Sequence, residues 1–123
     1  MNLTTNKVHH ETPCATSVLK FFGVKGVTWN ERTKTNVWDA TLRRSGFSVR
    51  SRFSKLKANE RSVGGSRRKL AEVARNEPDL LAFVVRVKGH VLVMDRNGKT
   101  VVDTAPRNRD HRKLLKVVAV FKA

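Results

Sequence analysis

The sequence predicts an α+β fold in which N-terminal helices pack on a C-terminal antiparallel β-sheet. Apolar residues recur at helical spacing near the N-terminus, short apolar or alternating runs fill the second half, and Asn97-Gly98 joins two of those runs. Because the helices come first and hairpin-linked strands follow, the order is typical of α+β domains. With 123 residues, we expect one domain over residues 1–123, with residues 1–11 forming a polar N-terminal arm.

The first predicted helix follows the arm and contains the only cysteine of the chain. Thr12 is a suitable N-cap, and Pro13 suits the first helical position because its missing N–H costs nothing there. Apolar side chains follow at spacings of three and four residues, and Gly23 ends the helix. Cys14 therefore lies in the first turn, where the helix dipole stabilises a thiolate. This position indicates a reactive thiol, and the competing interpretation is a small buried packing residue.

The middle of the chain is predicted to contain two further helices and one strand. A short second helix begins after the N-cap Asn36 and ends at Gly46. Residues 47–53 alternate between apolar and polar, which predicts a half-buried strand at a sheet edge. Gly64-Gly65 is predicted to form a flexible turn, after which Ser66 caps the third helix.

The Asn97-Gly98 hairpin allows one side-chain pairing to be deduced. A two-residue turn would pair Arg96 with Lys99 and place Leu92 opposite Asp103. Since His90 shares a strand face with Leu92, His90 and Asp103 become diagonal neighbours. A carboxylate that orients His90 would therefore be Asp103, provided that the register does not slip. The strands are predicted over residues 80–87, 90–95, 99–103 and 117–121.

A cysteine at a helix N-terminus and a histidine held by a carboxylate are the parts of a thiol hydrolase. In such a site His90 would take the thiol proton and later protonate the leaving group. Asp103 would fix the tautomer of the ring and support the imidazolium. Each residue also has a structural interpretation, His90 as a histidine at a strand start and Asp103 as a turn-forming carboxylate.

Three segments carry a resemblance to a known family. Residues 12–19, 89–94 and 101–106 resemble the papain-like cysteine peptidases, and are most similar to the bacteriocin-processing peptidases, which cleave double-glycine leaders, and to their stand-alone relatives. The resemblance implies a papain-like fold, a peptide or protein substrate, and a peptidase or amidase activity. It also implies the catalytic roles, namely Cys14 as nucleophile, His90 as general base and Asp103 as the residue that orients His90.

The sequence departs from that family at the oxyanion hole. The family usually has a glutamine six residues before the cysteine, and this chain has Val8 there. Asn6 and His10 are the candidate oxyanion residues, although neither has the expected spacing. Because loss of an oxyanion donor costs about 10²–10³ in rate, a catalytically inactive papain-like scaffold is the alternative interpretation.

The charge of the chain supports this alternative. Lys and Arg number 26 against 10 acidic residues, which gives a net charge of +16 and a field that attracts polyanions. We therefore also consider a basic protein associated with nucleic acid, for example within a larger assembly such as a virion, and an acidic protein partner. The predicted nucleic-acid-binding residues are Arg43, Arg44, Arg50, Arg52, Lys55, Lys57, Arg67, Arg68 and Lys69.

Neither a cofactor nor a membrane is expected. His9, His10, Cys14 and His90 do not have the spacing of a zinc site, so we expect no metal and no other cofactor. The chain has no run of about 18 apolar residues and no signal-peptide pattern, and one cysteine excludes an internal disulfide. We expect a cytoplasmic protein or one inside a nucleic-acid-rich particle.

Overall fold

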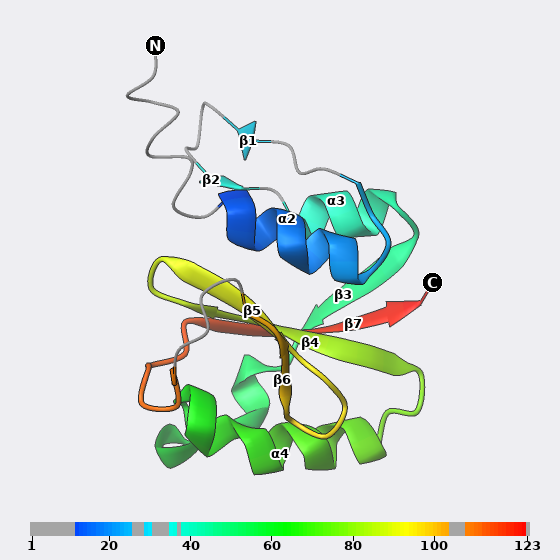
Figure 1. Cartoon of the computed structure of the whole chain (residues 1–123). Helices are drawn as coiled ribbons and strands as arrows, with labels where there is room; N and C mark the ends of the chain where they lie inside the picture. The colour runs from blue at the N-terminus through cyan, green and yellow to red at the C-terminus, as the bar shows by residue number, and fades with distance from the viewer. Residues whose placement is uncertain (1–11, 26–28, 31–34, 37, 104–107, 123) are drawn as a thin grey trace.

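A five-stranded antiparallel sheet forms the centre of the protein (Figure 1). The computed structural model describes residues 12–25, 29–30, 35–36, 38–103 and 108–122, with the backbone alone for 12–15, 29–30 and 35–36. The strand order is β3-β7-β4-β5-β6, so the predicted edge position of the first long strand is confirmed. The strands are β3 (Phe47–Ser51), β4 (Leu80–Val87), β5 (His90–Met94), β6 (Thr100–Val102) and β7 (Lys116–Lys122).

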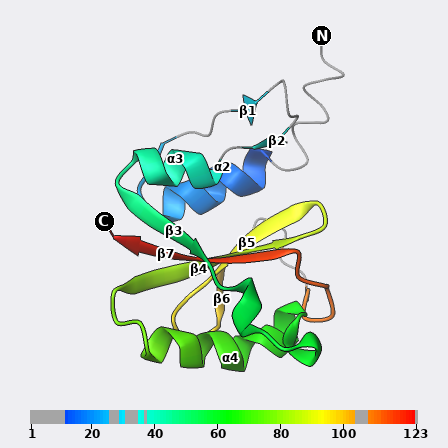
Figure 2. The ribbon, with the colours of Figure 1, turned by 180° about the vertical axis from the view of Figure 1, so that it is seen from behind.

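Helices cover both faces of this sheet. Helices α2 (Thr12–Phe21) and α3 (Trp38–Arg44) lie on one face, and α4 (Val63–Arg75) lies on the other (Figures 1 and 2). The predicted combination of helices with an antiparallel sheet is therefore confirmed. The smaller elements are β1 (Trp29–Asn30), β2 (Thr35–Asn36), and the 3-10 turns η1 (Phe53–Lys55) and η2 (Ala58–Glu60).

The core has two halves because β4 and β5 are buried on both faces. Leu92 and Met94 of β5 join the half that packs on α4, together with Leu70. Val91 and Val93 point the other way and join the half that packs on α2 and α3. Burial on both faces explains why the sequences of these strands are continuous apolar runs. Apolar and polar residues alternate along a strand only where one face of the sheet is exposed to solvent.

Two of the predicted helix starts are wrong. Asn36 belongs to β2, where it pairs with Trp29. Helix α4 begins at Val63 after the N-cap Ser62, whose hydroxyl accepts from the Gly65 N–H at 3.0 Å. The Gly64-Gly65 pair therefore lies inside the first turn of the helix. A Cβ on Gly64 would lie 2.8 Å from the Cβ of Asp110, so the glycine permits close packing there.

Ser66, which was predicted to be the cap, lies within α4. It is buried, and its hydroxyl donates to the Val63 carbonyl at 2.9 Å, which satisfies the polar group within the helix. Ser62 and Ser66 are both good N-cap residues, and the position of the segment against the sheet selects the earlier one.

The predicted two-residue hairpin is also wrong at its tip. The Asp95 N–H donates to the Lys99 carbonyl at 2.8 Å, so three residues form the loop and Arg96 does not pair with Lys99. Met94 then lies opposite Thr100, but a register shift between Val93 and Met94 restores the predicted pairing of Val93 with Val102. His90 and Asp103 are therefore neighbours as predicted, although the predicted turn is wrong.

Candidate functional site

His90 and Asp103 meet at the end of the sheet. His90 is the first residue of β5 and follows Gly89, whose φ of 72° turns the chain from β4 into β5. Asp103 comes directly after β6. The ring Nε2 lies 2.7 Å from the carboxylate Oδ1, and the His90 side chain is 8% exposed. The predicted proximity of the two side chains is confirmed, whereas their catalytic roles stay a prediction.

Arg109 is the third member of this cluster. Its Nε–H donates to Asp103 Oδ2 at 2.9 Å, and the arginine is 8% exposed. A guanidinium buried this deeply requires a carboxylate partner, so the pair fixes the plane of the Asp103 carboxyl group. The sequence contains no signal for this role of Arg109, because the contact depends on the tertiary structure.

The contact with Asp103 determines how His90 can act. An ionised carboxylate only accepts hydrogen bonds, so the proton of the neutral ring resides on Nε2 and is donated to Asp103. The lone pair is then on Nδ1, the nitrogen nearer the backbone. Nδ1 is therefore the atom through which His90 would accept a proton from a nucleophile.

Helix α2 brings the cysteine to the same end of the sheet. Cys14 belongs to the first turn of α2, and this helix packs along β5. In both views the start of α2 lies at the end of the sheet where the β4–β5 turn leads into His90 (Figures 1 and 2). The side chain of Cys14 and the oxyanion candidates Asn6 and His10 lie outside the described part of the structure.

Helix α2 and the His90 side chain lie on different faces of the sheet. Strand alternation places His90 with Leu92, on the face of α4, whereas α2 packs on the face of Val91 and Val93. A contact between Cys14 and His90 would therefore form around the end of β5 and not across the middle of a face.

A pocket of about 520 Å³ opens beside the carboxylate. Asp103 and Arg109 line it together with apolar side chains from α4 and β5, Val63 and Leu92. Thr100 adds a hydroxyl at the rim. The buried cluster therefore adjoins a space that can receive part of a ligand.

Several of the predicted nucleic-acid-binding residues have partners within the protein. Arg43 donates to the Val49 carbonyl at 3.0 Å, Arg52 pairs with Glu77, Arg67 pairs with Asp110, and Lys69 lies 3.5 Å from Glu72. Arg43 is nevertheless exposed, as are the others, Arg44, Arg50, Lys55, Lys57 and Arg68. The sequence located the basic segment but could not tell which of its side chains pair with groups elsewhere in the chain.

The described residues contain neither a metal-binding cluster nor a membrane-spanning helix. No group of three or more His, Cys, Asp or Glu side chains in this part of the chain could hold a metal ion. Within the same part, no helix combines the length and the apolar character needed to cross a membrane.

The fold and the site define an α+β domain with a buried His–Asp–Arg cluster at one end of its sheet. A scan of protein-family models and searches of curated proteins and of solved structures found no match to this chain.

Proposed function

We propose that the protein is a thiol hydrolase, a peptidase or amidase, with Cys14 as nucleophile, His90 as general base and Asp103 as the residue that orients His90. The observation that carries the proposal is the 2.7 Å contact between His90 Nε2 and Asp103 Oδ1, buried at the end of the sheet where α2 begins. A histidine with a fixed tautomer, at the end of the sheet where the helix with the only cysteine begins, supports this chemistry.

The residues would act in sequence on an amide. His90 Nδ1 takes the proton from Cys14, and the thiolate attacks the carbonyl carbon of the scissile bond. The imidazolium then gives its proton to the leaving nitrogen as the C–N bond breaks, which leaves a thioester on Cys14. Water, deprotonated by His90, hydrolyses that thioester and restores the thiol. Asp103 stays ionised and stabilises the imidazolium in both halves of the cycle.

The experiment measures alkylation of Cys14 by iodoacetamide in the full chain between about pH 5 and pH 8. A thiolate paired with an imidazolium has a pKa of about 3–4, so we expect the rate to stay nearly constant over this range. An ordinary thiol, with a pKa of about 8.5, would instead react about tenfold faster for each unit of pH.

His90→Ala should convert the flat profile into the steep one. His111→Ala is the matched control, because His111 is an exposed histidine in the segment after Arg109 and should leave the profile flat. A steep profile in the unaltered protein, or one that His90→Ala does not change, contradicts the proposal and leaves a scaffold without thiol chemistry.

A further inference from the structure

A groove lies at the opposite end of the sheet from His90. It consists of two adjoining pockets, of about 430 and 470 Å³, which share Arg52 and Glu77 as a common wall. The first lies beside the sheet edge formed by β3 and the end of β7, and the second runs along α4. We call the two pockets together the Arg52 groove.

The groove and the candidate catalytic cluster are far apart. Pro78 and Asp79, which line the groove, come directly before β4 in the chain. His90 lies beyond the other end of β4, after the turn that leads into β5. A strand of 8 residues spans roughly 25 Å at about 3.3 Å per residue. The groove is therefore a separate site, and its properties do not depend on the proposed thiol chemistry.

Positive side chains outnumber carboxylates around the groove, because five Lys and Arg residues line it against Glu72, Glu77 and Asp79. Arg50, Lys55 and Lys122 are exposed and line it, and among the described residues none of them pairs with a carboxylate. The pKa of Glu77 is lowered, first by its hydrogen bond from Arg52 and further by the charges of Lys55 and Arg50. Three positive side chains therefore act on the same carboxylate.

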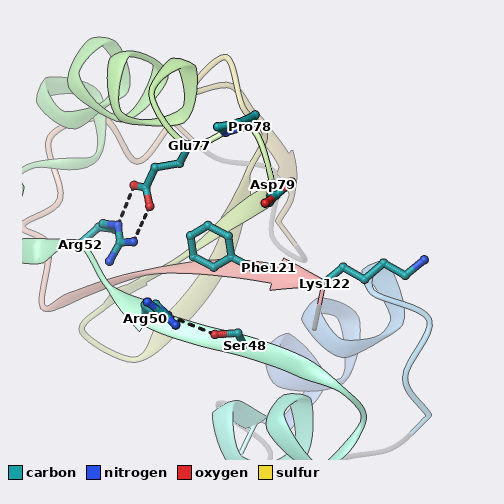
Figure 3. A pocket seen from close by; sticks show the side chains of 8 residues that line it. All are labelled: Ser48, Arg50, Arg52, Glu77, Pro78, Asp79, Phe121 and Lys122. Carbon is teal, nitrogen blue, oxygen red and sulfur yellow. Dashed lines mark hydrogen bonds and ion pairs between the residues drawn. The ribbon is translucent and has the colours of Figure 1, made fainter.

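An aromatic ring and a guanidinium lie close together in the groove. Figure 3 shows the half-buried Phe121 ring between the Arg52–Glu77 pair and Lys122. The Arg52 guanidinium lies 5.6 Å from the ring centroid, and Glu77 fixes its plane through hydrogen bonds to Nε and Nη2, the first at 2.8 Å. Aromatic rings and guanidinium planes are the surfaces on which unpaired bases stack.

We propose that the Arg52 groove binds single-stranded nucleic acid. Its cations contact successive phosphates, and Phe121 with Arg52 forms the platform for a base. A single strand fits this description better than a duplex, because the stacking surface lies inside a pocket and only an unpaired base can enter it. The contacts are to phosphates and to the faces of bases, so binding should show little dependence on sequence.

The first experiment measures the affinity of the full chain for an oligothymidylate of about 20 nucleotides between about 50 and 200 mM salt. The variant Arg50→Gln/Lys55→Gln/Lys122→Gln should bind at least about tenfold more weakly, with a salt slope lower by about two, because each contact to a single strand contributes about 0.7 to the slope. The control variant Arg68→Gln/Lys88→Gln/Lys99→Gln removes the same charge from exposed residues outside the groove and should bind within about twofold of the unaltered protein. Equal losses in the two variants would overturn the proposal, because they would show a diffuse field without a site.

The second experiment separates nucleic acid from other polyanions. Phe121→Leu keeps an apolar side chain at the sheet but removes the ring, and it should weaken oligothymidylate binding about fivefold or more. Its affinity for inorganic polyphosphate, which has no bases, should not change. If polyphosphate or vesicles with anionic lipid bind as tightly as the oligonucleotide, and Phe121→Leu leaves all of these affinities unaltered, the nucleic-acid assignment is wrong.

Discussion

Arg109 donates to one oxygen of Asp103 at 2.9 Å while His90 occupies the other at 2.7 Å. The carboxylate is thus held from two sides by groups that come from different segments of the chain. A carboxylate that both orients a histidine and is itself oriented has little freedom to rotate. We infer that Arg109 is a positioning residue for the proposed site, acting through Asp103.

The role of Arg109 can be tested with a double-mutant cycle. Arg109→Gln should slow Cys14 alkylation at pH 6 about tenfold, because the carboxylate loses its second anchor. Asp103→Asn should slow it at least as much, and the double variant should be no slower than Asp103→Asn alone. If Arg109 had a purely structural role, the losses in alkylation rate from the two single variants would add in the double variant. The temperature of unfolding, measured in parallel, reports how much Arg109 contributes to the stability of the fold.

Arg96 should be important for stability. Its guanidinium donates to the carbonyls of Ala74, Glu77 and Leu80, and so caps the end of α4 and the turn into β4. Hydrogen bonds from a charged donor to buried carbonyls are strong, so Arg96→Ala should lower the free energy of unfolding by about 3 kcal/mol. Urea unfolding measures this, with Arg75→Ala as control. Arg75 is exposed in the last turn of α4, and its replacement should change the free energy by less than about 0.5 kcal/mol.

Gly98 should tolerate no side chain. Its φ is 78°, and a Cβ would lie 2.3 Å from the carbonyl oxygen of Arg67 on α4. Gly98→Ala should therefore cost about 3 kcal/mol, from overpacking together with the left-handed conformation. Gly46 has a φ of 95° but no atom within 4 Å of its Cβ position, so Gly46→Ala should cost only about 1 kcal/mol. Equal losses for the two variants would mean that α4 can move away from the hairpin.

The Arg52–Glu77 pair should make stability depend on pH. The pKa of Glu77 in the folded protein is lowered by the hydrogen bond from Arg52, so the pair stabilises the fold at neutral pH. This contribution is complete above the usual glutamate pKa of about 4.3 and is lost as the pH falls through the lower folded value. Glu77→Gln should therefore be less stable than the unaltered protein at pH 7, and the difference should shrink as the pH falls toward about 3. Urea unfolding at several pH values measures it, and a difference that does not vary with pH would contradict the assignment.

The sequence by itself determined the class of fold, most of the strands and the pairing of His90 with Asp103. These depend on local signals, such as the apolar stripe after Cys14, the alternation in residues 47–53 and the Asn97-Gly98 turn. The hairpin prediction succeeded even with the wrong loop, because the register shift at Val93 compensated for the extra loop residue.

Only the tertiary structure decided which charged side chains pair with carboxylates far away in the sequence. Arg52 and Glu77 are 25 residues apart, and Arg67 meets Asp110 across 43 residues. No periodic pattern encodes such contacts. The start of α4 also depends on a contact between distant segments, because Gly64 allows Asp110 to approach the first turn of the helix. Local propensity fixes how a segment folds, but the partners of a charge depend on which distant segments the packing of the sheet brings beside it.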